Sequence, residues 1–213
     1  AEHLEIALTE AYYKGKKVVL EGGAIDVNGR GTLLTSEECL LHPSIQVRNP
    51  GFTKDDYEAV FSEYLGVTNV IWLGDGLHGD DTHGHIDDLC RFVNEDTIVT
   101  VVENNPEDAN YQPLQDNLKR LKAAKLENGT SPKVIELPMP KKMVFEKLRL
   151  PASYANFLIL NGAVLVPTFN DANDRIAITL LSECFPGREI IGISAVDFIW
   201  GFGSLHCLSQ QIV

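Results

Sequence analysis

Nine consecutive residues, 80–88, hold two histidines and four aspartates between apolar runs that are typical of strands. Titratable side chains rarely gather beside buried strands unless they bind a metal or do chemistry. His85 and Asp87 are two residues apart, so a strand would place both side chains on one face. We interpret them as one part of an active site, and we expect its other parts to be Glu21, far upstream, and Cys207, near the C-terminus.

These four residues suit the hydrolysis of a guanidinium group. Cys207 follows a glycine-broken segment, residues 201–206, and a cysteine becomes a strong nucleophile once a neighbouring charge or histidine lowers its pKa. Glu21 and Asp87 supply two carboxylates for a planar cation that donates paired hydrogen bonds. Cys207 would attack the central carbon, and loss of ammonia would leave a covalent thiouronium. Water activated by His85 would then hydrolyse this intermediate to a urea.

Two other interpretations stay open at this point. His83, His85 and Asp87 have a spacing that can chelate zinc from a strand, which predicts a metal-dependent hydrolase. That interpretation leaves Cys207 and Glu21 without a role. A cation-binding module without catalysis would explain the acidic residues, but it gives the cysteine and the histidine no function.

The composition is that of an ordinary globular protein with an acidic balance. The 213 residues suffice for a sizeable core, and the net charge of -12 argues against nucleic acid and anionic membranes while favouring a cationic ligand. No apolar run is long enough to span a bilayer, and nothing at the start of the sequence resembles a signal peptide. The four cysteines lack paired spacing, which predicts free thiols in a reducing compartment, the cytoplasm.

The apolar pattern predicts an α/β protein built from three units of strand, turn, strand, helix and strand. Asn28–Gly29 favours a hairpin turn, and Thr53 with Asp56 is a capping box before a helix that ends at Gly66. The expected strands span 17–27, 31–35, 67–73, 86–93, 97–102, 133–137, 154–160, 163–166, 188–193 and 205–213. The expected helices span 2–13, 53–65, 113–125 and a segment from Asp171 or Asp174 that faces Ile176 inward. Units of this length suggest a closed radial array, of which the last strand begins a fourth unit.

The turns relate two of the acids to each other. Glu21 lies seven residues before Asn28, and Asp87 lies seven residues before Asn94. We therefore expect the two carboxylates to occupy equivalent positions in successive units. Radial symmetry would bring them to one centre together with Cys207, which begins the incomplete unit at a comparable place.

Five segments resemble the agmatine deiminases and the bacterial-type (Porphyromonas-type) peptidylarginine deiminases of the guanidine-modifying superfamily. They are residues 21–35, 79–87, 150–157, 166–171 and 203–211, which run in order through nearly the whole chain. The resemblance implies a pseudo-fivefold α/β propeller of ββαβ units and a metal-free hydrolysis without a cofactor. It implies Cys207 as nucleophile, His85 as acid/base, and Asp87 and Glu21 as guanidinium ligands. Gly203, with Gly201, matches the glycine-rich approach that lets substrate come close.

The resemblance also has a departure. The family carries an upstream tryptophan-x-arginine-aspartate-x-glycine-proline motif, in which neither Trp72 nor Trp200 stands. Three units and a first strand are present where the propeller needs five. We therefore expect residues 1–213 to be the C-terminal part of a single propeller deiminase domain, without its N-terminal units, and to be poorly active or inactive alone.

The expected reaction is the conversion of agmatine to N-carbamoylputrescine and ammonia, since a small dication suits the acidic balance. Peptidyl-arginine is the alternative substrate, with the same mechanism, and the chain permits a homo-oligomer. Asp81 is a further candidate for substrate binding at the pocket mouth. Asn156 faces the same centre in a strand, where a structural hydrogen bond is an equal interpretation. The remaining histidines singled out as surface or structural are His42, His78 and His206.

Overall fold

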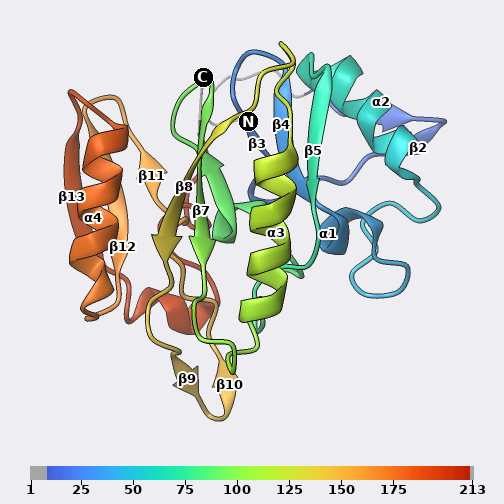
Figure 1. Ribbon diagram of the computed structural model, residues 1–213. Coiled ribbons are helices and arrows are strands. Elements are labelled where there is room, and N and C mark those ends of the chain that lie inside the picture. Colours follow the sequence, from blue (N-terminus) through green and yellow to red (C-terminus); the bar gives the residue numbers. More distant parts are fainter. Residues whose placement is uncertain (1–8, 212–213) are drawn as a thin grey trace.

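The computed structural model describes residues 9–211, in which small sheets are packed side by side with helices against them (Figure 1). Three sheets of the described chain share one plan: the central strand pairs antiparallel with the strand before it and parallel with the strand after it. The first is β3 (Asp26–Val27), β4 (Thr32–Ser36) and β5 (Asn69–Leu73); the second is β6 (Cys90–Phe92), β7 (Thr97–Val102) and β8 (Lys133–Pro138); the third is β11 (Leu158–Ile159), β12 (Ala163–Thr168) and β13 (Glu189–Ser194). The predicted α/β class and its three repeats are confirmed.

One helix joins the two parallel strands of each sheet. These helices are α2 (Lys54–Leu65), α3 (Tyr111–Ala123) and α4 (Asn173–Cys184). α3 packs against β7 and against β5 of the preceding sheet, and α4 packs in the same way against β13 and β8. Each of these two helices therefore links one repeat to the one before it.

The ends of α2 follow the predicted chemistry. The Thr53 hydroxyl accepts a hydrogen bond from the backbone N–H of Asp56, whose carboxylate accepts one from the N–H of Thr53. Gly66 ends the helix at a φ of 67°, a left-handed conformation that glycine adopts without strain.

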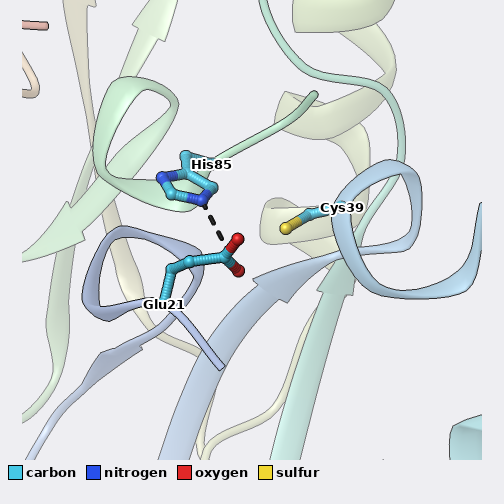
Figure 2. A group of neighbouring side chains, drawn as sticks. All are labelled: Glu21, Cys39 and His85. Carbon is cyan, nitrogen blue, oxygen red and sulfur yellow. Dashed lines mark ion pairs between the residues drawn. The ribbon is translucent and has the colours of Figure 1, made fainter. Parts of the chain in front are cut away.

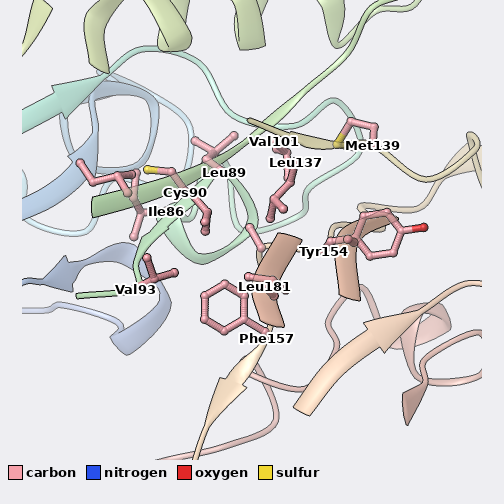
Figure 3. Packing of buried hydrophobic residues seen from close by; sticks show 14 of the residues in the cluster. Ile86, Leu89, Cys90, Val93, Val101, Leu137, Met139, Tyr154, Phe157 and Leu181 are labelled. Atoms are coloured by element: carbon pink, nitrogen blue, oxygen red, sulfur yellow. The ribbon is translucent and has the colours of Figure 1, made fainter. Parts of the chain in front are cut away.

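The core runs through the second and third repeats. Figure 3 shows part of it, in which Ile86 and Val101 of the second repeat pack together with Tyr154, Phe157 and Leu181 of the third. A smaller cluster around Tyr57 and Phe61 lies under α2. Within residues 9–211 no helix has the length and apolar character needed to cross a bilayer.

Several expected elements differ from the structure. The expected strands 17–27 and 86–93 are interrupted by the short 3-10 turns η2 (Gly22–Ala24) and η3 (Ile86–Asp88), so neither Glu21 nor Asp87 lies in a strand. Residues 205–208 form a turn and residues 209–211 have no regular structure, so no strand begins here, and the rest of that segment lies outside the described residues. The strand expected over 154–160 is reduced to β11, because turns occupy its first half.

Three short elements were not expected. They are the helix α1 (Glu37–Leu41), the hairpin of β9 (Val144–Phe145) with β10 (Leu148–Arg149), and the turn η4 (Phe198–Gly201). Residues 2–8 of the helix expected over 2–13 lie outside the described residues. Its end instead forms β1 (Tyr12–Tyr13), which pairs with β2 (Lys16–Lys17). Ile176 of α4 does not face inward, since 47% of its surface is exposed.

The register of the hairpins shows that Glu21 and Asp87 do not occupy equivalent positions in their repeats. The ladder pairs Val27 with Leu33 in the first repeat and Phe92 with Ile98 in the second, so that Val27 corresponds to Phe92. Counting back along both strands, Asp87 corresponds to Gly22 and not to Glu21. The expected equivalence was wrong, because Asn94 sits one position later in its turn than Asn28 does.

Candidate active site

A pocket of about 390 Å³ lies where three segments of the chain meet. The segments are residues 21–23, 81–87 and 201–211. All six residues predicted for the site line this pocket: Glu21, Asp81, His85, Asp87, Gly203 and Cys207. The structure therefore brings together side chains that the sequence separates by as many as 186 positions.

The turn that carries Cys207 is held by an asparagine. The Asn156 side-chain oxygen accepts hydrogen bonds from the Ser204 hydroxyl at 2.9 Å, from the N–H of His206 at 3.0 Å and from the N–H of Cys207 at 3.3 Å. Its Nδ2 donates to the Cys207 sulfur at 2.9 Å. A Cβ on Gly203 would come within 2.9 Å of the Cys207 Cβ, so glycine is what allows this tight turn.

Asp87 is buried at the floor of the pocket, beneath Cys207. Its Oδ2 accepts hydrogen bonds from His206 Nδ1 at 2.7 Å and from the Cys207 thiol at 3.5 Å. Its Oδ1 is buried and has no hydrogen-bond partner among residues 9–211. One oxygen thus orients the carboxylate and the other is left for a donor from outside the chain.

The loop before His85 is shaped by a single carboxylate. Asp80 Oδ1 accepts from the Thr82 N–H at 2.8 Å, and Oδ2 accepts from the N–H groups of Gly84 and His85 at 2.8 and 3.1 Å. These bonds curl the chain just before η3, which explains why the apolar run from Ile86 does not begin as a strand.

His85 and Glu21 approach each other across a glycine. Figure 2 shows His85, Glu21 and Cys39 turned toward one another, with an ion-pair contact of 3.9 Å between His85 Nε2 and Glu21 Oε2. A Cβ on Gly23 would lie 2.5 Å from His85 Nδ1 and 3.0 Å from Asp87 Oδ2. Only glycine lets the Glu21 segment come this close. Within the described chain His85 Nε2 is buried without a hydrogen-bond partner.

The Glu21 carboxylate already has a partner within the chain, the guanidinium of Arg48. Its Nε lies 3.0 and 3.2 Å from the two Glu21 oxygens, and its other nitrogens donate to the carbonyls of Cys39, Gln46 and Thr82. The Arg48 side chain is only 4% exposed. This internal guanidinium ties Glu21 to α1 and to the Asp80 loop, and it shares the carboxylate that was expected to bind substrate.

The buried acids shift the pKa values around Cys207. Burial, followed by the charge of Asp87, raises the pKa of Asp88 well above its usual range. Burial also raises the pKa of the Cys207 thiol, and the charges of Asp88 and Asp87 add to this effect. Burial likewise raises the pKa of Asp81 at the pocket wall. The resting pocket therefore disfavours further negative charge and favours a cation.

Two groups of side chains in the described chain have the composition and closeness to hold a metal ion. They are Glu21, Cys39 and His85, and Asp87, Asp88 and Cys207. His83 belongs to neither, because it turns away toward Glu38 at 3.7 Å, so the zinc set of His83, His85 and Asp87 does not assemble. The Arg48 cation beside Glu21 also opposes a metal in the first group.

Sequence reasoning missed Arg48 and Asp88 and misplaced His206, which lines the pocket and holds Asp87. Arg48 stands in a loop without a spacing signal. Asp88 could have been found as the acid next to Asp87, but the sequence does not show that one carboxylate faces the pocket and the other is sealed beneath it.

The chain matches known proteins along its length. The family model of the Porphyromonas-type peptidyl-arginine deiminases matches residues 2–212. An agmatine deiminase of Pseudomonas fluorescens is 36% identical over 217 residues, covering 93% of this chain and 58% of that protein. A C. jejuni agmatine deiminase, solved as a cysteine-to-serine variant with substrate bound, is 41% identical with a TM-score of 0.84, covering 91% of this chain and 56% of that one. An Enterococcus faecalis agmatine deiminase, solved catalysing its reaction, is 34% identical with a TM-score of 0.85, covering 91% and 57%. The chain thus spans less than two thirds of these relatives.

Proposed function

The chain belongs to the family of the Porphyromonas-type peptidyl-arginine deiminases, and we propose that it hydrolyses the guanidinium group of agmatine to a urea, with Cys207 as nucleophile. The observation that carries this proposal is the buried Asp87 Oδ1. The same carboxylate accepts from the Cys207 thiol through its other oxygen, Oδ2, at 3.5 Å, and Oδ1 has no partner in residues 9–211. A guanidinium N–H that binds this oxygen brings its central carbon to the sulfur.

The pocket supports a small cation as substrate. Its volume of about 390 Å³ and its three acidic side chains, Glu21, Asp81 and Asp87, suit a slender molecule with positive charge. Two similar proteins of known structure are agmatine deiminases, one of them solved with substrate bound, which favours agmatine over peptidyl-arginine.

The first half of the reaction breaks a carbon–nitrogen bond. The bound cation offsets the charge of Asp87, which adds to the effect of burial on the thiol pKa, so Cys207 gives its proton to His85. The sulfur bonds to the guanidinium carbon, and His85 returns the proton to the departing nitrogen. Ammonia leaves, and the carbon remains bound to Cys207 as a thiouronium.

The second half restores the cysteine. His85 takes a proton from water, whose oxygen attacks the same carbon. The carbon–sulfur bond breaks, His85 returns its proton to Cys207, and the remaining O–H proton passes to solvent, so that the product leaves as a urea, N-carbamoylputrescine when the substrate is agmatine. Glu21, shared between Arg48 and His85, holds the imidazole in place, and its part as a second guanidinium ligand stays a prediction.

We also propose that the three repeats are blades of a pseudo-fivefold α/β propeller. Their common strand order and the packing of α3 and α4 between successive sheets support this arrangement. The pocket lies beside η2 and η3, the turns that precede the first strands of two repeats, as a radial array requires.

The test is release of ammonia and N-carbamoylputrescine from agmatine by the intact protein and by its Cys207→Ala variant, with a chelator present throughout, because residues 1–213 alone are expected to be poorly active or inactive. We expect activity that survives the chelator and falls by at least about 10⁴-fold in Cys207→Ala. Cys184→Ala, a half-buried cysteine on α4 outside the pocket, is the matched control.

Each other outcome changes the proposal in a defined way. Activity lost to the chelator but kept in Cys207→Ala overturns the thiolate mechanism in favour of a metal-dependent hydrolase. Turnover of arginine peptides without turnover of agmatine overturns the substrate assignment in favour of peptidyl-arginine.

A further inference from the structure

The buried side chain of Asn156 donates hydrogen bonds to both the reacting sulfur of Cys207 and the carboxylate of Asp88. It is fully buried, and its Nδ2 donates at 2.9 Å to the Cys207 sulfur and at 3.0 Å to Asp88 Oδ1. Its oxygen accepts three hydrogen bonds from the turn 204–207. Every donor and acceptor of the amide is used.

We propose that Asn156 is a further catalytic residue, whose amide donates a hydrogen bond that stabilises the Cys207 thiolate while its oxygen fixes the turn that carries the nucleophile. The proposal rests on the function proposed above only in taking Cys207 as the nucleophile. It concerns the free enzyme and needs no assumption about the substrate.

The direction of the amide is fixed by its surroundings. Three donors converge on one end of the group, from the Ser204 hydroxyl and from the N–H groups of His206 and Cys207. A flipped amide would point its own N–H groups at all three, so the nitrogen must face the sulfur. The three hydrogen bonds to the Asn156 oxygen thus orient its Nδ2 donor toward the Cys207 sulfur.

The charges around the sulfur explain why a donor is needed there. Asp87 lies 3.5 Å from the thiol, Asp88 lies beneath both, and His206 faces Asp87 from the same turn. Burial and the charge of Asp87 oppose formation of a thiolate. A hydrogen bond to the charged form works in the other direction, and Asn156 supplies one without adding charge.

The alternative is that Asn156 only anchors the turn, and two variants of similar size separate the roles. Asn156→Asp keeps the accepting oxygen but loses the Nδ2 donors. Asn156→Leu also loses the donors and adds no charge. The losses common to both are the Nδ2 hydrogen bonds to the Cys207 sulfur and to Asp88.

The readout is the alkylation of Cys207 by iodoacetamide in the absence of substrate, followed by mass spectrometry of the peptide that contains it over a range of pH. A hydrogen bond to a charged group shifts a thiol pKa by about 1–2 units, and the greater nucleophilicity of a more basic thiolate offsets part of the effect. We expect the alkylation rate at a given pH to fall about three- to tenfold in both variants.

The matched control is Asn117→Ala. Asn117 is also buried and bonds the backbone of Gly74 and Asp75, outside the pocket. This variant also loses buried hydrogen bonds, and we expect its Cys207 to be alkylated at the wild-type rate. Circular dichroism and thermal unfolding establish that each variant is folded before the alkylation rates are compared.

Wild-type alkylation of Cys207 in either Asn156 variant overturns the proposal, as does an equal fall in Asn117→Ala. If Asn156→Leu does not fold, the smaller neutral variant Asn156→Ala takes its place, because the added charge of Asn156→Asp would by itself slow alkylation. A protein that deiminates no guanidine yet shows the expected alkylation pattern would refute the proposed function and leave this inference standing.

Discussion

The two sides of the pocket differ in how completely their buried side chains are hydrogen-bonded. On the nucleophile side, which comprises Asp88, Asn156, Ser204 and Cys207, the hydrogen bonds of the asparagine amide are complete. On the histidine side, which comprises Glu21, Arg48 and His85, a buried ring nitrogen lacks a partner in the described part of the chain and its nearest acid stands 3.9 Å away.

A buried polar atom without a partner costs about 1–3 kcal/mol, so the open groups are a cost carried by the free protein. The two buried atoms without a partner in the described chain are His85 Nε2 and Asp87 Oδ1. The nucleophile must be held still for attack, whereas the proton carrier and the substrate ligand must accept groups that come and go. The difference shows that the site is rigid where a bond forms and unfilled where substrate and water enter.

Removing the charge of Asp87 tests this division most severely. We expect Asp87→Asn to lower kcat/KM by about 10²–10³-fold, because the substrate cation loses its buried counter-charge. Alkylation of Cys207 without substrate should rise instead, since the Asp87 charge raises the thiol pKa. Steady-state kinetics and alkylation rates measure the two effects.

Asp55→Asn is the control for net charge, because Asp55 is exposed at the first turn of α2. Unchanged turnover in Asp87→Asn would refute the role of Asp87 as a substrate ligand. A fall in both turnover and alkylation would mean that the variant had disturbed the Cys207 turn itself.

Breaking the Arg48 pair tests how the histidine side is held. Arg48→Ala leaves the Glu21 carboxylate and three carbonyls without their donor, and we expect the free energy of unfolding to fall by about 2–3 kcal/mol. This is less than for a fully buried pair because Glu21 is 40% exposed. Urea denaturation measures the change.

Arg30→Ala provides the comparison, since Arg30 and Glu95 form an ion pair in which both side chains are 61% exposed. Its expected cost is under about 0.5 kcal/mol. An Arg48 variant no less stable than the Arg30 variant would show that the buried guanidinium does not organise this side of the pocket.

The parts of the fold that could be predicted are those with local causes. Buried strands such as β7 follow from continuous β-branched runs, and α2 follows from its Thr53 cap and from Gly66. The turns η2 and η3 were missed because distant contacts create them. Gly23 turns under His85 and Asp87, and Asp80 curls the chain through backbone bonds that the apolar pattern does not reveal.

The site could be predicted as far as residue types carry information. Cys207, His85, Asp87 and Glu21 were found from their chemistry, and all four line the pocket. The register argument was nevertheless wrong, because one asparagine is displaced within its turn. The reactive side chains are recognisable in sequence, whereas the groups that aim them, such as Arg48 and Asn156, depend on tertiary structure.

The last prediction concerns the acid sealed under the nucleophile. Burial and Asp87 hold the pKa of Asp88 well above the value of about 3.9 for an unfolded chain. Above about pH 4 the unfolded state releases this proton while the folded state keeps it, so the group lowers stability as pH rises toward the folded pKa. Asp88→Asn removes this loss. Its stability relative to wild type should therefore grow with pH, by at most about 1.4 kcal/mol per pH unit.

Asp56 gives the opposite sign and serves as the reference. Lys14 and the Thr53 cap lower its pKa to about 2, so its stabilisation is complete above about pH 4 and is lost as pH falls through the folded pKa. Between about pH 5 and 8 the difference between Asp56→Asn and wild type should be flat, while that of Asp88→Asn climbs. Urea denaturation across this range decides. A flat difference for Asp88→Asn would mean that Asp88 is ionised in the folded protein, and the Cys207 thiol would then have two full negative charges near it, those of Asp87 and Asp88.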